Sequence, residues 1–302
     1  MAFNPPAARP GWHRLSRHLT GYAFTGPALL VFLAFIVYPI VYSLQLSFHE
    51  WSGFTIDWGP FVGLQNYLDL ARDEVFWKAT KNTAIFVLAR TPVEVGIGFG
   101  LALLLDRAIP GRGLLRTLFF IPVVMSLVVV TIIFQRIYET NAGLLNTFLH
   151  WAKLDALAHP WLADPQTALG AVIAVSIWKN VGFSLVILLA GLQGLPHDVI
   201  EAAKVDGATT GQLIARIITP LMRPVLAMTA LLSVISGLKV FDLIFIMTRG
   251  GPIYSTEVLA TLLYRQAFEL NNMGLASAVA VVMVAIVMAT AAAQFAVLRN
   301  QD

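Results

Sequence analysis

The chain has 302 residues, of which 58% are hydrophobic and only 12% are charged. Soluble domains usually carry about 25% charged residues, so a water-soluble fold would leave much of this apolar surface uncovered. The composition therefore excludes an ordinary soluble protein and predicts an all-α membrane protein embedded in a lipid bilayer.

The sequence also excludes several kinds of site. It contains no cysteine, which rules out disulfides, iron–sulfur clusters and thiolate metal sites. It lacks the nucleotide-binding loop G-x-x-x-x-G-K-[ST], the zinc motif H-E-x-x-H and the nucleophile elbow G-x-S-x-G. We therefore expect no catalytic residue, no metal, no cofactor and no nucleic acid on this chain.

Six apolar segments reach the roughly 20 residues that a helix needs to cross a bilayer. In chain order they are 22–48, 83–105, 114–133, 168–192, 221–247 and 275–298. The first segment follows a basic stretch, as a signal peptide would, but it is too long and lacks an A-x-A cleavage signal. We expect it to be an uncleaved helix. The connecting loops are short, so residues 1–302 are predicted to form one membrane domain.

The distribution of basic residues predicts the orientation, because Lys and Arg collect in cytoplasmic loops. With both termini in the cytoplasm, the inside segments hold 10 Lys and Arg residues and the outside loops hold 7. The inside count includes Arg9, Arg14 and Arg17 at the N-terminus. Five of the seven tryptophans fall in outside loops, as in an aromatic belt. Both termini are therefore expected inside.

The inside loop between the fourth and fifth spans is predicted to hold two short helices. Asp198 is placed to cap the first helix, with Glu201 completing a capping-box-like pair, and Gly207 suits the left-handed residue after its end. The second helix is expected over 211–218, stopped by Pro220.

The first of these helices has the features of a docking surface. Ala202 and Ala203 are small enough to let another surface approach the backbone, and Glu201 and Asp206 offer charges to a basic partner. A surface helix that only joins two spans explains the spacing equally well, because caps are common.

At these residues the chain resembles the permease subunits of bacterial ATP-binding-cassette importers. Their cytoplasmic loop has the form E-A-A, three residues, G, about nine residues and I-x-x-P, and 201–203, Gly207 and 217–220 fit this form before the penultimate span. The resemblance extends over nearly the whole chain and narrows to carbohydrate permeases of the maltose and glycerol-phosphate type. The further stretches that carry it are 63–67, 76–77, 82–83, 119–122, 191–196 and 248–252.

The resemblance implies the partners and the mechanism. It implies a multi-pass subunit of the bacterial inner membrane, working as the first of two homologous permeases. Two ATPase subunits would hold ATP and Mg²⁺, and an extracytoplasmic solute-binding protein would deliver a carbohydrate. The helix over 199–206 would sit in a groove of the ATPase. The coupling residues would be Glu201, Ala202, Ala203, Asp206 and Gly207.

Charged side chains within spans are costly and are functional candidates by default. Arg90 and Glu94 are spaced i, i+4, and Lys239 and Asp242 are spaced i, i+3, so each pair would share a helix face and neutralise itself. We favour an internal ion pair, or a contact to the partner permease, over substrate contact for both pairs.

A mixture of hydroxyl, amide, ammonium and aromatic groups in the fourth span suits a sugar, which is bound through its hydroxyls and by ring stacking. Its position matches the place where maltose-type permeases hold their sugar. Serines in spans more often bond their own backbone, which weakens the serine candidates. The substrate-pathway candidates are Ser126, Ser176, Lys179, Asn180, Phe183, Ser233, Gly237, Lys239 and Asp242.

Two alternatives of other classes stay open. A proton-driven secondary transporter would use Glu94, Lys239 and Asp242 as titrating groups, but such transporters usually show internal repeats, and we find no convincing repeat here. A structural assembly factor would have no pathway at all. The identity of the sugar is open as well, with Lys179 or Arg249 a weak indication of an anionic or strongly polar ligand.

Overall fold

The computed structural model describes residues 24–54, 57, 59–107 and 109–299. The basic residues expected to hold the N-terminus inside, Arg9, Arg14 and Arg17, lie outside these ranges, as does the start of the first expected span. Within the described ranges the fold is all-α, with one isolated β-bridge between His49 and Phe61.

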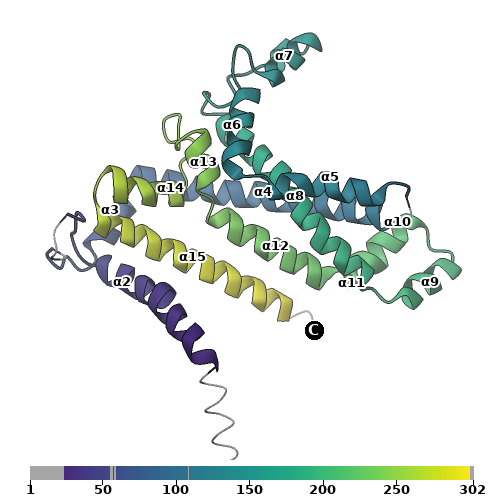
Figure 1. Ribbon diagram of the computed structural model, residues 1–302, viewed down its shortest axis with the longest axis horizontal. Helices are drawn as coiled ribbons and strands as arrows, with labels where there is room; N and C mark the ends of the chain where they lie inside the picture. The colour runs from purple at the N-terminus through teal and green to yellow at the C-terminus, as the bar shows by residue number, and fades with distance from the viewer. Residues whose placement is uncertain (1–23, 55–56, 58, 108, 300–302) are drawn as a thin grey trace, which may run out of the picture.

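The helices follow one another in a fixed order along the chain (Figure 1). They are η1 (Leu33–Val37), α2 (Tyr38–Leu46), α3 (Gln65–Arg72), α4 (Glu74–Asp106), α5 (Arg112–Val124), α6 (Leu127–Ile137), α7 (Leu144–Trp151), η2 (Asp155–Leu157), α8 (Ala168–Gln193), α9 (His197–Val205), α10 (Thr210–Leu213), η3 (Ile214–Ile218), α11 (Thr219–Leu221), α12 (Arg223–Leu238), α13 (Asp242–Met247), α14 (Leu259–Tyr264), η4 (Arg265–Glu269) and α15 (Met273–Arg299).

Four unbroken helices are long and apolar enough to cross a membrane: Phe24–Leu46, α4, α8 and the part of α15 over Met273–Gln294. Two further candidates are bent pairs. The α5 and α6 helices meet at 95°, and the helix over Thr210–Leu221 meets α12 at 69°. The described residues therefore hold between four and six candidate spans. The prediction of a continuous helix over 114–133 is wrong.

The expected span over 221–247 is also interrupted. Its helix α12 ends at Leu238, and α13 begins at Asp242 after a non-helical turn in which Phe241 has φ −130° and ψ −67°. The helix predicted to stop at Pro220 continues to Leu221, and the bend falls at Met222 instead. Pro224 accounts for this position, because proline is tolerated only in the first turn of the helix that follows it.

The second expected span is longer than its hydropathy suggests. Helix α4 begins at Glu74 rather than near residue 83, and the Asp73 side chain caps it by accepting a hydrogen bond from the amide of Val75 at 2.8 Å. Nine polar and mixed residues thereby extend the helix beyond its apolar part. A hydropathy window misses such an extension, whereas the capping residue marks it.

The helix of the fourth inside loop forms as expected, with a different start. Helix α9 has Pro196 at its N-cap position and no side-chain cap, so the role predicted for Asp198 is wrong. Gly207 has φ +81°, the left-handed conformation predicted for it. The capping box belongs to the next helix, where Thr209 and Gln212 cap each other.

The core of the bundle is the packing of α8 against α4 and α5, with α12 against α4. On α8, a Cβ atom added to Gly182 would lie 2.0 Å from the carbonyl oxygen of Phe119 on α5. On α4, a Cβ atom at Gly98 would lie 2.9 Å from Cβ of Ser184. These glycines allow the helix backbones to approach each other, as small residues do in membrane bundles.

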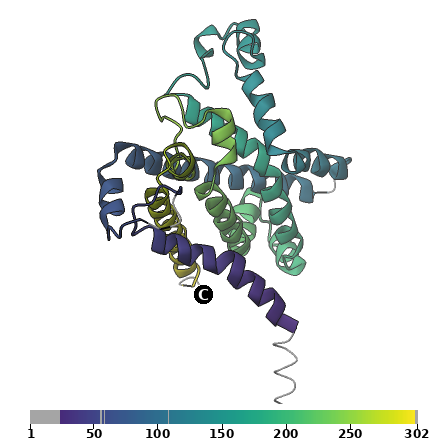
Figure 2. The ribbon, with the colours of Figure 1, turned by 60° about the vertical axis from the view of Figure 1, so that its left-hand side comes forward.

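The remaining helices are arranged around this core. Both views show the helix that ends in α2 at the edge of the bundle and the arm of α6 and α7 projecting from it (Figures 1 and 2). Only 6% of the most apolar window of Phe24–Leu46 is buried, against 56% for α8. Helix α9 lies at the opposite end of the molecule from α3 and α14 (Figure 1).

The contact at Gly182 predicts a large effect of one methyl group. Gly182→Ala would force α5 away from α8, and we expect a marked fall in the melting temperature of the detergent-solubilised protein, measured by fluorescence-detected size-exclusion chromatography. The matched control is Gly170→Ala on the same helix, where an added Cβ meets nothing within 4 Å. It should be neutral or slightly stabilising, since alanine is the better helix former. Equal melting temperatures for the two variants would contradict the packing.

Candidate functional site

A buried polar cluster joins the middle of α4, α8 and α12. The Arg90 guanidinium donates through Nε to Oε2 of Glu94 at 2.8 Å, and both side chains are at most 3% exposed. The hydroxyl of Ser184 donates to Oε1 of Glu94 at 2.8 Å, and that of Ser233 donates to Oε2 at 3.1 Å. The ion pair predicted within α4 is therefore present, and it is held by hydroxyls from two other helices.

The two charges of the cluster, on Arg90 and Glu94, neutralise each other. Each Glu94 oxygen accepts at least one hydrogen bond, and Arg90 supplies the opposite charge. A buried ion pair is stable only when its remaining polar atoms are also bonded. The serines fulfil this condition for Glu94, so the cluster fixes how the three helices pack. Arg90 keeps further N–H donors, because only Nε and one terminal nitrogen are bonded.

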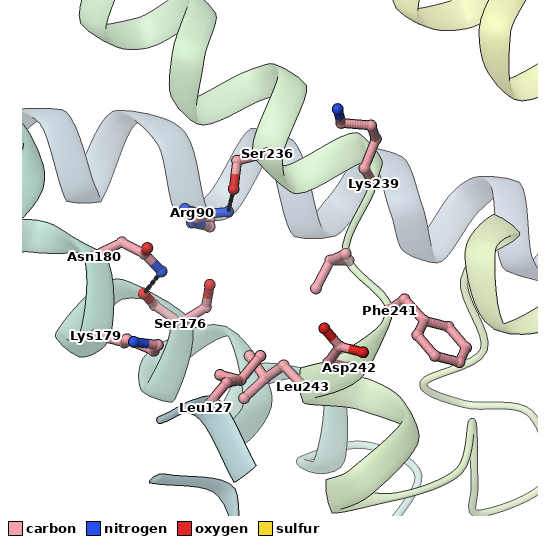
Figure 3. A pocket seen from close by; sticks show the side chains of 11 residues that line it. Arg90, Leu127, Ser176, Lys179, Asn180, Ser236, Lys239, Phe241, Asp242 and Leu243 are labelled. Atoms are coloured by element: carbon pink, nitrogen blue, oxygen red, sulfur yellow. Dashed lines mark hydrogen bonds between the residues drawn. The ribbon is translucent and has the colours of Figure 1, made fainter. Parts of the chain in front are cut away.

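Beside the cluster lies a cavity of about 200 Å³ (Figure 3). It lies at the turn between α12 and α13 and also borders α4, α8 and the start of α6. Its polar lining consists of side chains with hydroxyl, amide, amino, guanidinium or carboxylate groups. These are Arg90, Ser176, Lys179, Asn180, Ser236, Lys239 and Asp242.

The predicted ion pair between Lys239 and Asp242 is absent from the salt bridges of the described residues. Spacing of i, i+3 brings side chains together only within a continuous helix. The helix is interrupted between these two residues, so they diverge. Figure 3 shows Asp242 directed toward the cavity and Lys239 turned away from it.

The Lys179 ammonium is already fully engaged. Its Nζ atom donates to the backbone oxygens of Pro122 at 3.0 Å, Val123 at 3.2 Å and Met125 at 3.1 Å. An ammonium has three N–H donors, and three acceptors use all of them. Lys179 borders the cavity but has no donor left for a ligand.

Asn180 keeps most of its capacity for hydrogen bonding. Its Nδ2 atom donates to the carbonyl of Ser176 one turn earlier at 2.8 Å (Figure 3). The amide oxygen and one N–H remain for a ligand. Asn180 also lines a second cavity of about 230 Å³, together with Phe183 and Ser233.

The two remaining pathway candidates line neither of these cavities. Ser126 is the exposed residue that precedes α6. Gly237 faces α4, where an added Cβ would lie 3.0 Å from Cγ2 of Val87. Its role in the structure is to allow close packing of α12 on α4.

Sequence reasoning missed Ser184 and Ser236. The signal for Ser236 was present, because Ser233 and Ser236 are spaced i, i+3 and therefore lie on one helix face. Ser184 had no such signal, since it becomes significant only when α8 places it against Glu94 of α4.

The cavity is suited to binding a ligand rich in hydroxyl groups. The Asp242 carboxylate can accept, the Ser176 and Ser236 hydroxyls can donate or accept, and the Asn180 amide can do both. Phe241 adds an aromatic side chain to the lining. Among the described residues no group of three or more His, Asp or Glu side chains could hold a metal ion.

Residues 94–300 match the family described as the binding-protein-dependent transport system inner membrane component. The chain belongs to this family. It is therefore a permease, a multi-pass component of an inner membrane transport system.

Two curated relatives are similar over most of their length. The permease is 37% identical to the probable ABC transporter permease protein YurN of Bacillus subtilis, over 89% of this chain and 92% of that protein. It is 34% identical to the trehalose/maltose transport system permease protein MalF of Thermococcus litoralis, over 86% and 87%.

A solved bacterial transporter shares the fold. A chain of the ABC transporter involved in import of the acidic polysaccharide alginate matches with a TM-score of 0.80 and 26% identity, over 94% of this chain and 97% of that one. A chain of a bacterial alginate ABC transporter, solved in complex with an alginate pentasaccharide-bound periplasmic protein, matches with a TM-score of 0.78.

The buried cluster predicts an asymmetric effect of substitutions. Arg90→Met leaves the Glu94 carboxylate buried without a counter-charge, which typically costs about 3–5 kcal/mol. We expect a large loss of thermal stability, which the double variant Arg90→Met/Glu94→Met should partly restore.

Thermal unfolding of the purified permease in detergent measures both variants. The control is Ser236→Ala, whose hydroxyl lies 3.5 Å from Arg90 at the limit of a hydrogen bond, and it should change little. A double variant that is less stable than Arg90→Met would contradict a self-neutralised pair.

Proposed function

We propose that this permease passes a sugar or sugar derivative from an extracytoplasmic binding protein into the cytoplasm. The observation that carries the proposal is the polar cavity at the turn between α12 and α13, with Ser176, Asn180 and Asp242 in its lining. The relatives that transport trehalose, maltose and alginate support the same class of ligand.

The charges around the cavity favour a neutral or weakly charged saccharide. Arg90 is paired with Glu94, and Lys179 is saturated by backbone carbonyls. Of the cavity's charged groups outside that ion pair and Lys179, Asp242 faces the cavity and Lys239 turns away from it (Figure 3). The anionic ligand indicated by Lys179 in the sequence thus loses its main support.

The energy for transport would come from two partner ATPase subunits that hold ATP and Mg²⁺. Helix α9 supports this proposal because it stands at one end of the molecule with Glu201, Ala202 and Asp206 exposed and Ala203 half-buried. Gly207 ends α9 in a left-handed turn, after which the chain continues into α10. The proton-driven alternative is weakened because Glu94 is held in an ion pair.

We propose that the end carrying α9 faces the cytoplasm, with both termini on that side. The end carrying α3 and α14 would then receive the binding protein. The exposed apolar helix over Phe24–Leu46 would face lipid or the second, homologous permease, because 94% of its most apolar window is unburied in the single chain. The whole chain would act as one membrane domain.

Uptake by the reconstituted complex tests the proposed function. The permease with its second permease, its ATPases and its binding protein is placed in proteoliposomes, and uptake of the sugar retained by that binding protein is measured. We expect uptake that requires both ATP and the binding protein. Uptake without ATP, or a binding protein that retains no saccharide, would refute the proposal.

Variants of the cavity locate the pathway. Asp242→Ala and Ser176→Ala each remove a hydrogen bond to the sugar, and we expect a loss of uptake of about tenfold, the effect of roughly 1.4 kcal/mol. The control is Thr117→Ala, which removes an exposed hydroxyl bonded to its own helix on α5. Equal uptake by all three variants would place the pathway elsewhere.

Variants of α9 test the coupling. Glu201→Lys reverses a charge offered to the ATPase, and Gly207→Asp places a side chain at φ +81°. We expect both proteins to reach the membrane but to hydrolyse ATP without transporting sugar. Arg216→Glu, a charge reversal in the adjacent helix, serves as the control. Coupled uptake in the Glu201 and Gly207 variants would remove the role of α9.

A further inference from the structure

We infer that Lys179 is a positioning residue, which holds the break between α5 and α6 and thereby sets the wall of the cavity that carries Asp242. The role of Lys179 at the break is independent of the proposed function. The effect of Lys179 on sugar uptake rests on the proposed function.

The break exposes backbone carbonyls that the helix no longer satisfies. Met125 and Ser126 are extended, with ψ of 143° and 131°, so the amides that would continue the helix turn away from the end of α5. The last carbonyls of any helix lack intrahelical partners, and hydrocarbon provides no substitute. The 95° bend joins two apolar helices, so its carbonyls need a donor from elsewhere in the protein.

Lys179 is that donor. Its ammonium, carried by α8, lies within 3.2 Å of the oxygens of Pro122, Val123 and Met125. A positive charge at the end of a helix is also favourable, because the carbonyl end carries partial negative charge. One side chain thus satisfies three carbonyls and neutralises the end of α5.

A second side chain connects α6 to the helix that lines the cavity. Gln135 on α6 donates through Nε2 to the carbonyls of Ile246 at 2.7 Å and Met247 at 3.2 Å, at the end of α13. Helix α13 begins with Asp242, which lines the cavity. Lys179, α6, Gln135 and α13 therefore form a continuous connection from the break to Asp242.

Distance measurements across the break test the inference. The chain has no cysteine, so Leu118→Cys on α5 and Arg136→Cys on α6, both exposed, are its only spin-labelling positions. The labels are introduced into the complete complex with cysteine-free partners, and their separation is measured by double electron–electron resonance. With Lys179 intact we expect one narrow distance.

Lys179→Met removes all three donors, and the distance should broaden or shift. Lys179→Arg keeps the charge and the donors and should restore it in large part. Sugar uptake should fall at least about tenfold in the methionine variant, since one charge-assisted hydrogen bond is already equivalent to that factor. If the methionine variant does not accumulate, Lys179→Gln, which retains two N–H donors, replaces it.

Gln135→Leu is the matched control, because it removes the hydrogen bonds to α13 and keeps those of Lys179 at the break. It should raise the KM for uptake and leave the label distance unchanged. An unchanged distance in Lys179→Met would overturn the inference. So would a broadened distance with unaltered uptake kinetics, because the break would then not position the cavity. Both results are separable from a failure of the proposed function, in which even the unaltered complex takes up no sugar.

Discussion

The hydrocarbon interior of a membrane offers no hydrogen bonds, so every interruption of a spanning helix must be satisfied by the protein itself. Two of the helix interruptions in the described residues border the polar cavity, one between α5 and α6 and one between α12 and α13. The ammonium of Lys179 donates to the carbonyls at the first interruption. The amide of Gln135 donates to a carbonyl at the C-terminal end of α13, the helix that follows the second interruption. The polar cavity lies between these interruptions, and non-helical backbone in a membrane protein is tolerated where it borders such a space.

The buried Arg90–Glu94 cluster serves a different purpose from the cavity beside it. It places charge at the centre of α4, and the serines of α8 and α12 complete its hydrogen bonds. A self-neutralised cluster fixes helix packing without attracting ions, whereas the adjoining Asp242 faces the cavity (Figure 3). The Arg90–Glu94 pair thus holds the helices together, and Asp242 offers its carboxylate to a ligand.

Hydropathy located the apolar segments well, because length and composition are local properties. It failed where one helix depends on another. The break at Met125 is bonded by Lys179 of another helix, which no local pattern predicts. The i, i+3 spacing of Lys239 and Asp242 predicts no contact once the helix is interrupted at Phe241. The pair of Arg90 and Glu94 was predictable because it lies within one unbroken helix. Gly207 was predictable too, since a glycine after a short helix favours a left-handed turn.

The central claim is that the space between the two helix interruptions holds the transported sugar. The most direct measurement is a cryo-electron microscopy structure of the complete complex, trapped during transport with the sugar of its binding protein. We predict sugar density in contact with Ser176, Asn180 and Asp242, with Lys179 still bonded to the carbonyls of α5. Sugar density elsewhere in the complex, with this cavity closed by side chains, would contradict it.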